Sequence, residues 1–371
     1  MTLFKSQIAQ RRWQNFKANR RAYWSLWIFS VLFGISLFSE FVANDKPLLV
    51  SYQGELRMPI FTFYKETEFG GEFETEAEYS SPEVQCLIVT GGALDPCIDD
   101  PEGAMEDAQD GLLGADPIQT GWMLWPLIPY SFDTINYNVA TAPSAPDANH
   151  WFGTDDQTRS VIARVIYGVR ISVVFALVTV ISSAVLGIIA GGTMGYHGGW
   201  IDLVFQRIEE IWSSMPLLYT LIILGAILTM NFWMLSLIVA VFSWMGIAGI
   251  VRAEFLRARN FEYVRAARAL GVKDWKIMFR HMLPNAMVGT VTLLPFAITG
   301  AVGTLTTLDF LGFGLPPSYP SLGELALQAK ENFQAPHLAY SAFFSIAIML
   351  SLLVFIFEGV RDAYDPRKTF K

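Results

Sequence analysis

Charged side chains are scarce in this sequence. They make up 16% of its 371 residues, whereas hydrophobic residues make up 53% and the mean hydropathy is +0.37. Soluble domains usually carry about a quarter charged residues. The length alone would allow two or three soluble domains, but this composition excludes them. Much of the chain must face lipid instead.

The residues that build catalytic and metal sites are also few. The chain has four histidines and two cysteines, no HExxH sequence, and no lysine that follows a glycine. A phosphate-binding loop of the GxxxxGK(S/T) kind is therefore excluded, and ATP cannot be bound in that manner. His150 and His337 fall in stretches that we expect outside the cell membrane, and His197 and His281 in stretches expected inside. We therefore expect no catalytic residue, no metal site and no cofactor site in this chain.

The long apolar runs contain no charge. Asp, Glu, Lys and Arg are absent from residues 171–194, 211–251, 286–308 and 338–357. Carriers driven by protons or ions usually keep ionisable groups inside the membrane, because those groups carry the coupling. Asp309 lies at the end of one run, where we expect it to be solvated. If the protein drives transport, the energy must come from a partner.

Six stretches are long and apolar enough, or nearly so, to cross a membrane. A spanning helix needs about 20 apolar residues, because each adds about 1.5 Å across a core of about 30 Å. The stretches are 23–42, 171–194, 201–229, 232–251, 286–308 and 338–357. We therefore predict an all-α integral membrane protein with six transmembrane helices. Only Met230 and Asn231 separate the third stretch from the fourth, which predicts a tight antiparallel hairpin.

The first stretch follows a basic segment, so a cleaved signal peptide is the alternative to a membrane anchor. Its apolar run is longer than the usual core of a signal peptide. Phe41 and Ala43 also make a poor small-residue cleavage site. We expect a permanent anchor.

Lysine and arginine are unevenly distributed along the chain. Residues 44–156 hold 21 of the 34 acidic residues and three basic ones, whereas the first 22 residues, the stretch 251–285 and the C-terminal end hold 18 of the 26 Lys and Arg. Cytoplasmic loops retain Lys and Arg, so we place both termini and the loop after residue 251 in the cytoplasm. The predicted order is cytoplasmic 1–22, periplasmic 43–170, cytoplasmic 252–285, periplasmic 309–337 and cytoplasmic 358–371.

The segment 43–170 is too long for a simple loop and is predicted to be partly folded. Residues 48–63, with Gln53-Gly54 in the middle, are typical of a β-hairpin. Cys86 and Cys97 both fall in this segment, and an oxidising compartment and a short separation favour a disulfide over two unpaired thiols. The aspartates near them lack the ligand spacing of an EF-hand calcium loop.

The loop 252–285 contains an ordered series of small and large residues, VRAARALGVKDWKIMFRHMLPN, at positions 264–285. Ala266 and Ala267 belong to a small-faced helical turn, Gly271 ends it, a second short helix begins at Asp274, and Leu283-Pro284 closes the unit. The simpler interpretation is a basic surface loop that only sets topology. A short helix with small side chains can instead lie deep in a groove of another protein, with the glycine allowing a sharp turn behind it. We predict such a docking element.

The spacing AAxxxG followed by Leu283-Pro284 resembles the EAA loop of permease subunits of ABC importers. The pattern departs from that family at Arg265, which often is glutamate there, and at His281, which often is isoleucine. The first departure leaves no carboxylate for a salt bridge at that position, while the helix-glycine-helix pattern is kept. Other segments are similar to dipeptide and oligopeptide permeases. They are WFGTD at 151–155 with Arg159, IYGVRIS at 166–172, Gly195-Tyr196 through Gly199 with Trp200 and Asp202, Ser214-Met215-Pro216, LDFLGFGL at 308–315 with Pro320 to Gly323, and RDAYDPR at 361–367. The N-terminal RRAYWSLWIFSVLFGISLFSE and FVANDKPLLV look most like the YejE branch of that family.

This resemblance implies the type I ABC importer permease fold in a bacterial inner membrane. It implies a heterodimer with a second homologous permease, a cytoplasmic ATPase whose two nucleotide-binding domains bind ATP and Mg, and a periplasmic substrate-binding protein. No nucleic acid is expected as a partner. The YejE branch is associated with import of peptides and of microcin C, a peptide-nucleotide antibiotic. The residues implied in coupling to the ATPase are Arg265, Ala266, Ala267, Gly271, Leu283 and Pro284, and Pro216 is either a kink near the inner gate or a merely tolerated proline.

Two other functions are compatible with the composition. A solute channel or secondary carrier would transport as the purified chain alone, driven by a gradient. A membrane-anchored protein would act through residues 44–167, which would then fold and function in isolation. An uncharged pathway fits peptides, peptide conjugates or nickel chelates, so the sequence leaves the substrate open.

Overall fold

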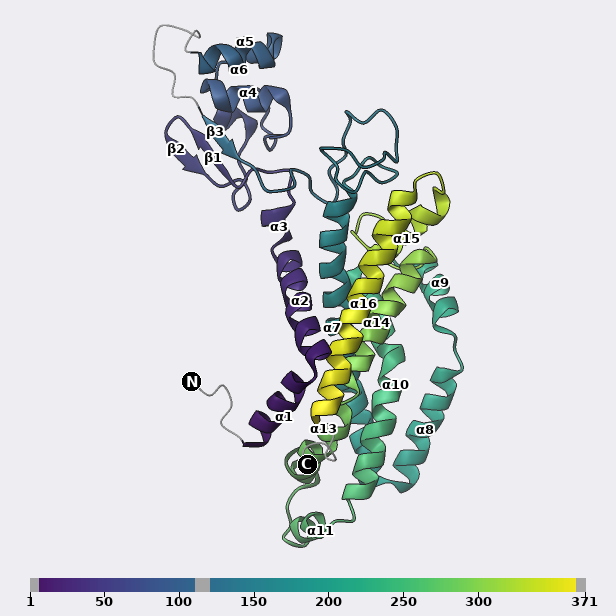
Figure 1. Cartoon of the computed structure of the whole chain (residues 1–371). Coiled ribbons are helices and arrows are strands. Elements are labelled where there is room, and N and C mark those ends of the chain that lie inside the picture. Colours follow the sequence, from purple (N-terminus) through teal and green to yellow (C-terminus); the bar gives the residue numbers. More distant parts are fainter. Residues whose placement is uncertain (1–6, 111–120, 365–371) are drawn as a thin grey trace. The chain divides into compact units, whose positions relative to one another are not determined.

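The chain folds as two compact units, one made of Met1–Phe33 with Gly168–Lys371 and the other of Gly34–Tyr167. The structure is a computed structural model and describes residues 7–110 and 121–364. The first unit is helical, and the second combines short strands with short helices (Figure 1). The predicted long segment between the first and second apolar runs is therefore a folded unit.

The helical unit is built from long apolar helices and short connecting helices. Its elements are α1 (Gln7–Ala18), α2 (Arg20–Leu37), α7 (Val161–His197), α8 (Gly199–Ser213), α9 (Leu217–Ile227), α10 (Phe232–Ala258), α11 (Glu262–Ala269), α12 (Asp274–Lys276), α13 (Leu283–Val291), α14 (Leu294–Phe310), α15 (Leu322–Glu331) and α16 (Pro336–Tyr364). α2 and α7 continue into the second unit. Within the helical unit, α16 packs against α1, α14 and α15 (Figure 1).

Four helices in the described part of the chain are long and apolar enough to cross a membrane. They are α7, α10, α16 and the stretch Gly289–Phe310, which joins the end of α13 to α14. A fifth span results if α8 and α9, which are bent by 75° against each other, are counted as one. α2, which starts with Arg20 and Arg21, is not among these spans. The predicted first span, and with it the count of six, stays a prediction.

The bend between α8 and α9 lies at Pro216. This residue is the N-cap of α9 and has an extended backbone, with φ −67° and ψ 125°. Proline has no N–H to donate, so helical hydrogen bonding cannot continue through it. The predicted third span is thus two helices rather than one. At the other end of α9, the side chain of Asn231 accepts a hydrogen bond from the Met234 N–H at 3.0 Å and caps α10, which closes the predicted tight turn.

Glycines bring α7 and α10 into close contact. A Cβ at Gly187 would lie 2.7 Å from the carbonyl oxygen of Trp244, and one at Gly191 would overlap the backbone of Ala248. Small residues four apart are a usual means of packing membrane helices backbone to backbone. These positions follow a GxxxG spacing. The contact holds α7 close against the middle of α10.

Asp309, at the end of α14, is buried and not solvated as predicted. Only 3% of it is exposed, and its carboxylate accepts hydrogen bonds from the Leu315 N–H at 2.7 Å and from the Ser321 hydroxyl. Buried carboxylates require such partners. The reason for the difference is tertiary, because the turn between α14 and α15 folds back over Asp309. Gly314 makes room for the carboxylate in that turn.

The second unit contains a three-stranded antiparallel sheet with the order β2-β1-β3. The strands are β1 (Leu49–Tyr52), β2 (Glu55–Arg57) and β3 (Trp122–Leu124). β1 and β2 form the predicted hairpin, and Gln53 and Gly54 take φ angles of 49° and 82°, as a tight two-residue turn requires. The hairpin is shorter than predicted, because β2 ends at Arg57 and Pro59 cannot donate to a ladder.

Three short helices follow this hairpin. They are α4 (Pro82–Thr90), α5 (Leu94–Asp99) and α6 (Pro101–Gln109), and α4 packs on β1 and contacts both other helices. Phe69, Tyr79, Cys86 and Cys97 belong to their buried core. The two cysteines are joined as a disulfide, with their Cα atoms 5.5 Å apart. Burial raises the pKa of the Tyr79 phenol well above its usual range, so this hydroxyl stays protonated.

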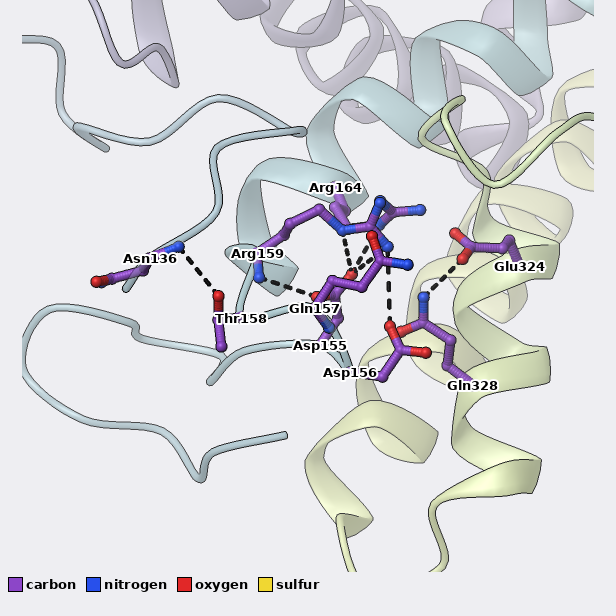
Figure 2. Close-up of polar contacts among 9 residues, drawn as sticks. All are labelled: Asn136, Asp155, Asp156, Gln157, Thr158, Arg159, Arg164, Glu324 and Gln328. Atoms are coloured by element: carbon purple, nitrogen blue, oxygen red, sulfur yellow. Dashed lines mark hydrogen bonds and ion pairs between the residues drawn. The ribbon is translucent and has the colours of Figure 1, made fainter. Parts of the chain in front are cut away.

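A buried group of charges lies just before α7 and in its first turn. Nε and Nη2 of Arg159 are each 2.7 Å from Oδ2 of Asp155, and Nε of Arg164 is 3.5 Å from the same oxygen (Figure 2). All three residues are buried. Removing one partner from a buried ion pair is costly, so these contacts fix the start of α7. Asp155 and Arg159 lie in a segment that resembles peptide permeases, but their ion pair was not predicted from the sequence.

Candidate functional site

The chain between α10 and α13 is the candidate site. α11, α12 and a π-helical turn (Ile277–Met282) follow one another here, and α11 lies beyond the end of α10 in Figure 1. Alanine is the best helix former, and α11 contains three alanines. Glu262 in its first turn and Arg268 in its last turn complement the helix dipole. The predicted order of two short helices around a glycine is present.

Gly271 ends α11 in a left-handed conformation with φ +73°. Its N–H donates to the Arg268 carbonyl at 3.0 Å, and the Val272 N–H donates to the Ala267 carbonyl at 3.1 Å. These two bonds are those of a Schellman motif, which favours glycine at this position because a Cβ is disfavoured at positive φ. A Cβ at Gly271 would meet no atom within 4 Å. The requirement for glycine is therefore one of backbone conformation and not of space.

Ala267 faces the interior of the chain. It is 8% exposed and belongs to a core with Phe255 of α10, Val264 of α11, and Ile277 and Met282 of the π-helical turn. Ala267 therefore packs within the chain itself, and its predicted contact with a partner stays a prediction. Val264 and Ala267 are three positions apart on α11, so both point to the same side of the helix. That side packs on α10 and fastens the loop to the membrane helices.

The other side of the loop is exposed. Arg265 and Ala266 are exposed on α11, and the exposed fractions of Leu270 and Trp275 are 83% and 63%. Phe279 of the π-helical turn is also more than half exposed. Large exposed apolar patches can mark interaction sites. Leu270, Trp275 and Phe279 are called the exposed apolar residues below.

A polar contact connects α11, α12 and α7. The Tyr196 hydroxyl donates to Oδ1 of Asp274 at 2.5 Å, and the Arg268 guanidinium lies over the Tyr196 ring, 5.1 Å from its centre. Hydrogen bonding to Tyr196 raises the pKa of Arg268. A cation over an aromatic face is attracted to it. Tyr196 lies in one of the segments that resemble peptide permeases, but no local pattern pairs it with Asp274.

Leu283 and Pro284 begin α13 directly after the π-helical turn. Pro284 stands in the first positions of α13, where a missing N–H costs least. The wider π turn before it avoids the clash that a proline ring makes in an α-helix. Leu283 packs against the core of the loop, whereas Pro284 is exposed. Leu283 thus supports the loop from within.

Metal ligands do not gather at this loop. Its histidine, His281, is half-buried, and its carbonyl accepts a hydrogen bond from Asn285 at 3.4 Å. Within residues 7–110 and 121–364, no group of three or more His, Cys, Asp or Glu residues is placed to hold a metal ion. The contacts that this loop offers are packing and hydrogen bonding.

Known proteins resemble nearly the whole chain. Residues 183–370 match the family described as binding-protein-dependent transport system inner membrane component, and residues 6–57 match the N-terminal TM domain of oligopeptide transport permease C. The chain is 52% identical to the peptidoglycan transport system permease protein YejE of Agrobacterium fabrum, over 99% of this chain and 95% of that protein. It is 48% identical to the inner membrane ABC transporter permease protein YejE of Escherichia coli, over 98% of each.

More distant similarity extends to other transporters. The dipeptide transport system permease protein DppC of Bacillus subtilis is 32% identical over 60% of this chain and 70% of that protein. A chain of the MetNI methionine ABC transporter, solved in inward facing conformations, has 19% identity and a TM-score of 0.45, and the match covers 54% of this chain and 96% of that chain.

Proposed function

The chain belongs to the family of binding-protein-dependent transport system inner membrane components, and from this premise we propose that it forms half of a pathway for peptides or peptide conjugates. It is a permease subunit of an ABC importer. The channel, carrier and anchored-protein alternatives are therefore set aside. Its energy comes from an ATPase on a separate chain, which binds ATP and Mg.

The substrate class is supported by the chemistry that the relatives' names share. One relative is named for peptidoglycan, another for dipeptides, and a matching family segment for oligopeptides. Peptide backbone is common to all three. The resemblance to the YejE branch adds microcin C, a peptide joined to a nucleotide, as a candidate. The periplasmic binding protein selects among such solutes before they reach this chain.

The coupling role rests on one observation, namely that the loop after α10 has one side packed on α10 and one side exposed. Val264, Ala267 and Ile277 pack it onto α10, whereas Leu270 on the other side is 83% exposed. Packed interiors are stiff, so a displacement imposed on the exposed side moves α10 and α13 with it. Arg265, Ala266 and the exposed apolar residues contact the ATPase, Gly271 sets the turn, and Leu283 and Pro284 pass the motion into α13. The bend at Pro216 serves as part of the inner gate.

The distribution of charge supports a membrane orientation. The segments rich in Lys and Arg, which include α1 and the loop after α10, lie in the cytoplasm, and the acidic unit Gly34–Tyr167 lies in the periplasm. A second homologous permease completes the pathway as a heterodimer. Reporter fusions to the C-terminus test this orientation, since alkaline phosphatase activity there would contradict it.

The coupling role is tested in the complete transporter in proteoliposomes. Leu270→Ser with Trp275→Ser should remove stimulation of ATP hydrolysis by loaded binding protein and reduce co-purification of the ATPase. Phe333→Ser is the matched control for co-purification of the ATPase, because Phe333 is 84% exposed on a segment outside this loop. Uptake of a labelled peptide is measured in the same vesicles. Wild-type stimulation in the double variant would contradict the coupling role, and uptake that persists without the ATPase would contradict the importer mechanism.

A further inference from the structure

A cavity of about 280 Å³ lies between α1, α2 and α16. Trp13 and Phe16 of α1, Leu26 of α2, and Ile356 and Val360 of α16 line it, and Arg12 stands among these apolar residues. Its walls are thus the short helix α1, the start of α2 and the end of α16, which is long and apolar enough to cross a membrane. The cavity therefore lies where α16 ends, at the level expected for the membrane surface.

The three helices are held together beside the cavity by a close contact. A Cβ at Gly359 of α16 would overlap Ala22, and it would lie 3.0 Å from the Phe16 ring. Phe16, Ala22 and Ala363 are all buried there. The space beside this contact is lined by residues of α1, α2 and α16.

The surroundings of the cavity are cationic. Arg11, Arg12, Lys17, Arg20, Arg21 and Arg361 carry positive charge on α1, the start of α2 and the end of α16, against Glu358 and Asp362. No acidic residue precedes Glu40 in the whole sequence. The Arg12 guanidinium lies 4.2 Å from the centre of the Tyr364 ring, and Lys17 lies 5.4 Å from that of Trp13. Both cations are therefore held beside the aromatic wall.

We propose that this cavity binds an anionic phospholipid, with an acyl chain between Trp13, Leu26 and Val360 and its phosphate on Arg12. An apolar space with a cationic rim at the membrane surface matches the two ends of such a lipid. Charge complementarity favours an anionic headgroup over a zwitterionic one. The lipid would fasten α1 to the membrane and to α16. This proposal concerns a part of the chain away from the coupling loop, so it can fail while the coupling role holds.

The test uses the complete transporter, exchanged into detergent with phosphatidylglycerol or phosphatidylcholine, and native mass spectrometry counts bound lipid. Wild type should retain phosphatidylglycerol preferentially. Arg12→Gln should weaken that retention about fivefold, since each basic residue near an anionic surface contributes about 1 kcal/mol. Arg207→Gln is the charge control, because Arg207 is exposed and paired with Glu210 on α8. Val360→Trp should exclude the lipid by filling the cavity, while Ile348→Trp, at an exposed position of the same helix, should not.

A second measurement locates the lipid without relying on a variant of the cationic rim. Phosphatidylglycerol with brominated acyl chains quenches tryptophan fluorescence at short range. The quenched fraction should fall in Trp13→Phe relative to wild type, because Trp13 lines the cavity. Equal retention of the two lipids, retention unchanged in Arg12→Gln and Val360→Trp, or quenching that does not involve Trp13 would each overturn the proposal.

Discussion

Asp202 and Arg252 form a two-bond ion pair that joins α8 to α10. Nε of Arg252 lies 2.5 Å from Oδ1 of Asp202, and Nη2 lies 2.7 Å from Oδ2. Parallel N–H donors that match both carboxylate oxygens make such pairs stronger than single contacts. Asp202 precedes the bend at Pro216, and Arg252 precedes the loop after α10. The pair therefore connects the bent helices to the helix that carries the coupling loop.

The first prediction concerns this pair. Asp202→Asn should lower the stability of the purified chain by about 1.5–3 kcal/mol, as expected for a lost hydrogen bond to a charged group. Arg207→Gln, which breaks the exposed pair with Glu210, should cost about 0–1 kcal/mol. Thermal unfolding in one detergent compares the two. Equal effects would show that the Asp202–Arg252 pair is no stronger than a surface pair.

A second prediction concerns Gly271. Gly271→Val should abolish stimulated ATP hydrolysis, because a β-branched residue at φ +73° carries a strain of about 1–3 kcal/mol. Gly271→Asn should retain most activity, since asparagine tolerates this conformation. A Cβ at Gly271 would meet no atom within 4 Å, so a clash at the Cβ cannot explain a difference. ATP turnover of the reconstituted complex with loaded binding protein is the measurement, and equal activity of the two variants would refute the conformational argument.

Ala266 and Ala267 provide a matched pair for the third prediction. Ala267→Trp should destabilise the chain by about 1–3 kcal/mol, because it overfills the core that fastens the loop. Ala266→Trp should leave the stability of the isolated chain nearly unchanged, since Ala266 is exposed, but it should weaken association with the ATPase. Thermal unfolding and co-purification separate these effects. The proposed docking side is incorrect if Ala266→Trp binds the ATPase normally.

Arg268 and Arg265 differ in their contacts, and the fourth prediction depends on that difference. Arg268→Gln should reduce coupling more than Arg265→Gln, because Arg268 lies over Tyr196 and connects α11 to α7. Tyr196→Phe keeps the ring under Arg268 but loses the hydrogen bond to Asp274, so its effect should be smaller than that of Arg268→Ala. Stimulated ATP turnover ranks the variants. A greater loss in Arg265→Gln would mean that direct contact with the partner outweighs the support of the loop.

The fifth prediction concerns Cys86 and Cys97. Maleimide should label neither cysteine in intact cells until a reductant is added, because both sulfurs are in the disulfide and no other cysteine exists in the chain. Cys86→Ala with Cys97→Ala should destabilise the second unit by about 2–3 kcal/mol, as expected for a short closed loop. Reduced wild type serves as the reference. Labelling of both residues without reductant would exclude the disulfide in the cell.

The sequence predicted those features that depend on neighbouring residues. Apolar runs indicated α7, α10, α14 and α16, since lipid burial demands about 20 apolar residues in succession. The AAxxxG spacing placed Gly271 at the end of α11, because a left-handed helix end favours glycine. Gln53-Gly54 placed the hairpin for a similar reason. The family followed from several such short segments together.

Only the tertiary structure decided which residues of an element face inward and which residues distant in sequence come into contact. Both alanines of the AA pair look alike in sequence, but α10 covers Ala267 and leaves Ala266 exposed. Asp309 is buried because a turn folds over it, and Tyr196 meets Asp274 across 78 positions of chain. A local pattern records a residue's own conformational and hydrophobic preference, whereas burial and pairing depend on where the fold brings other segments of the chain.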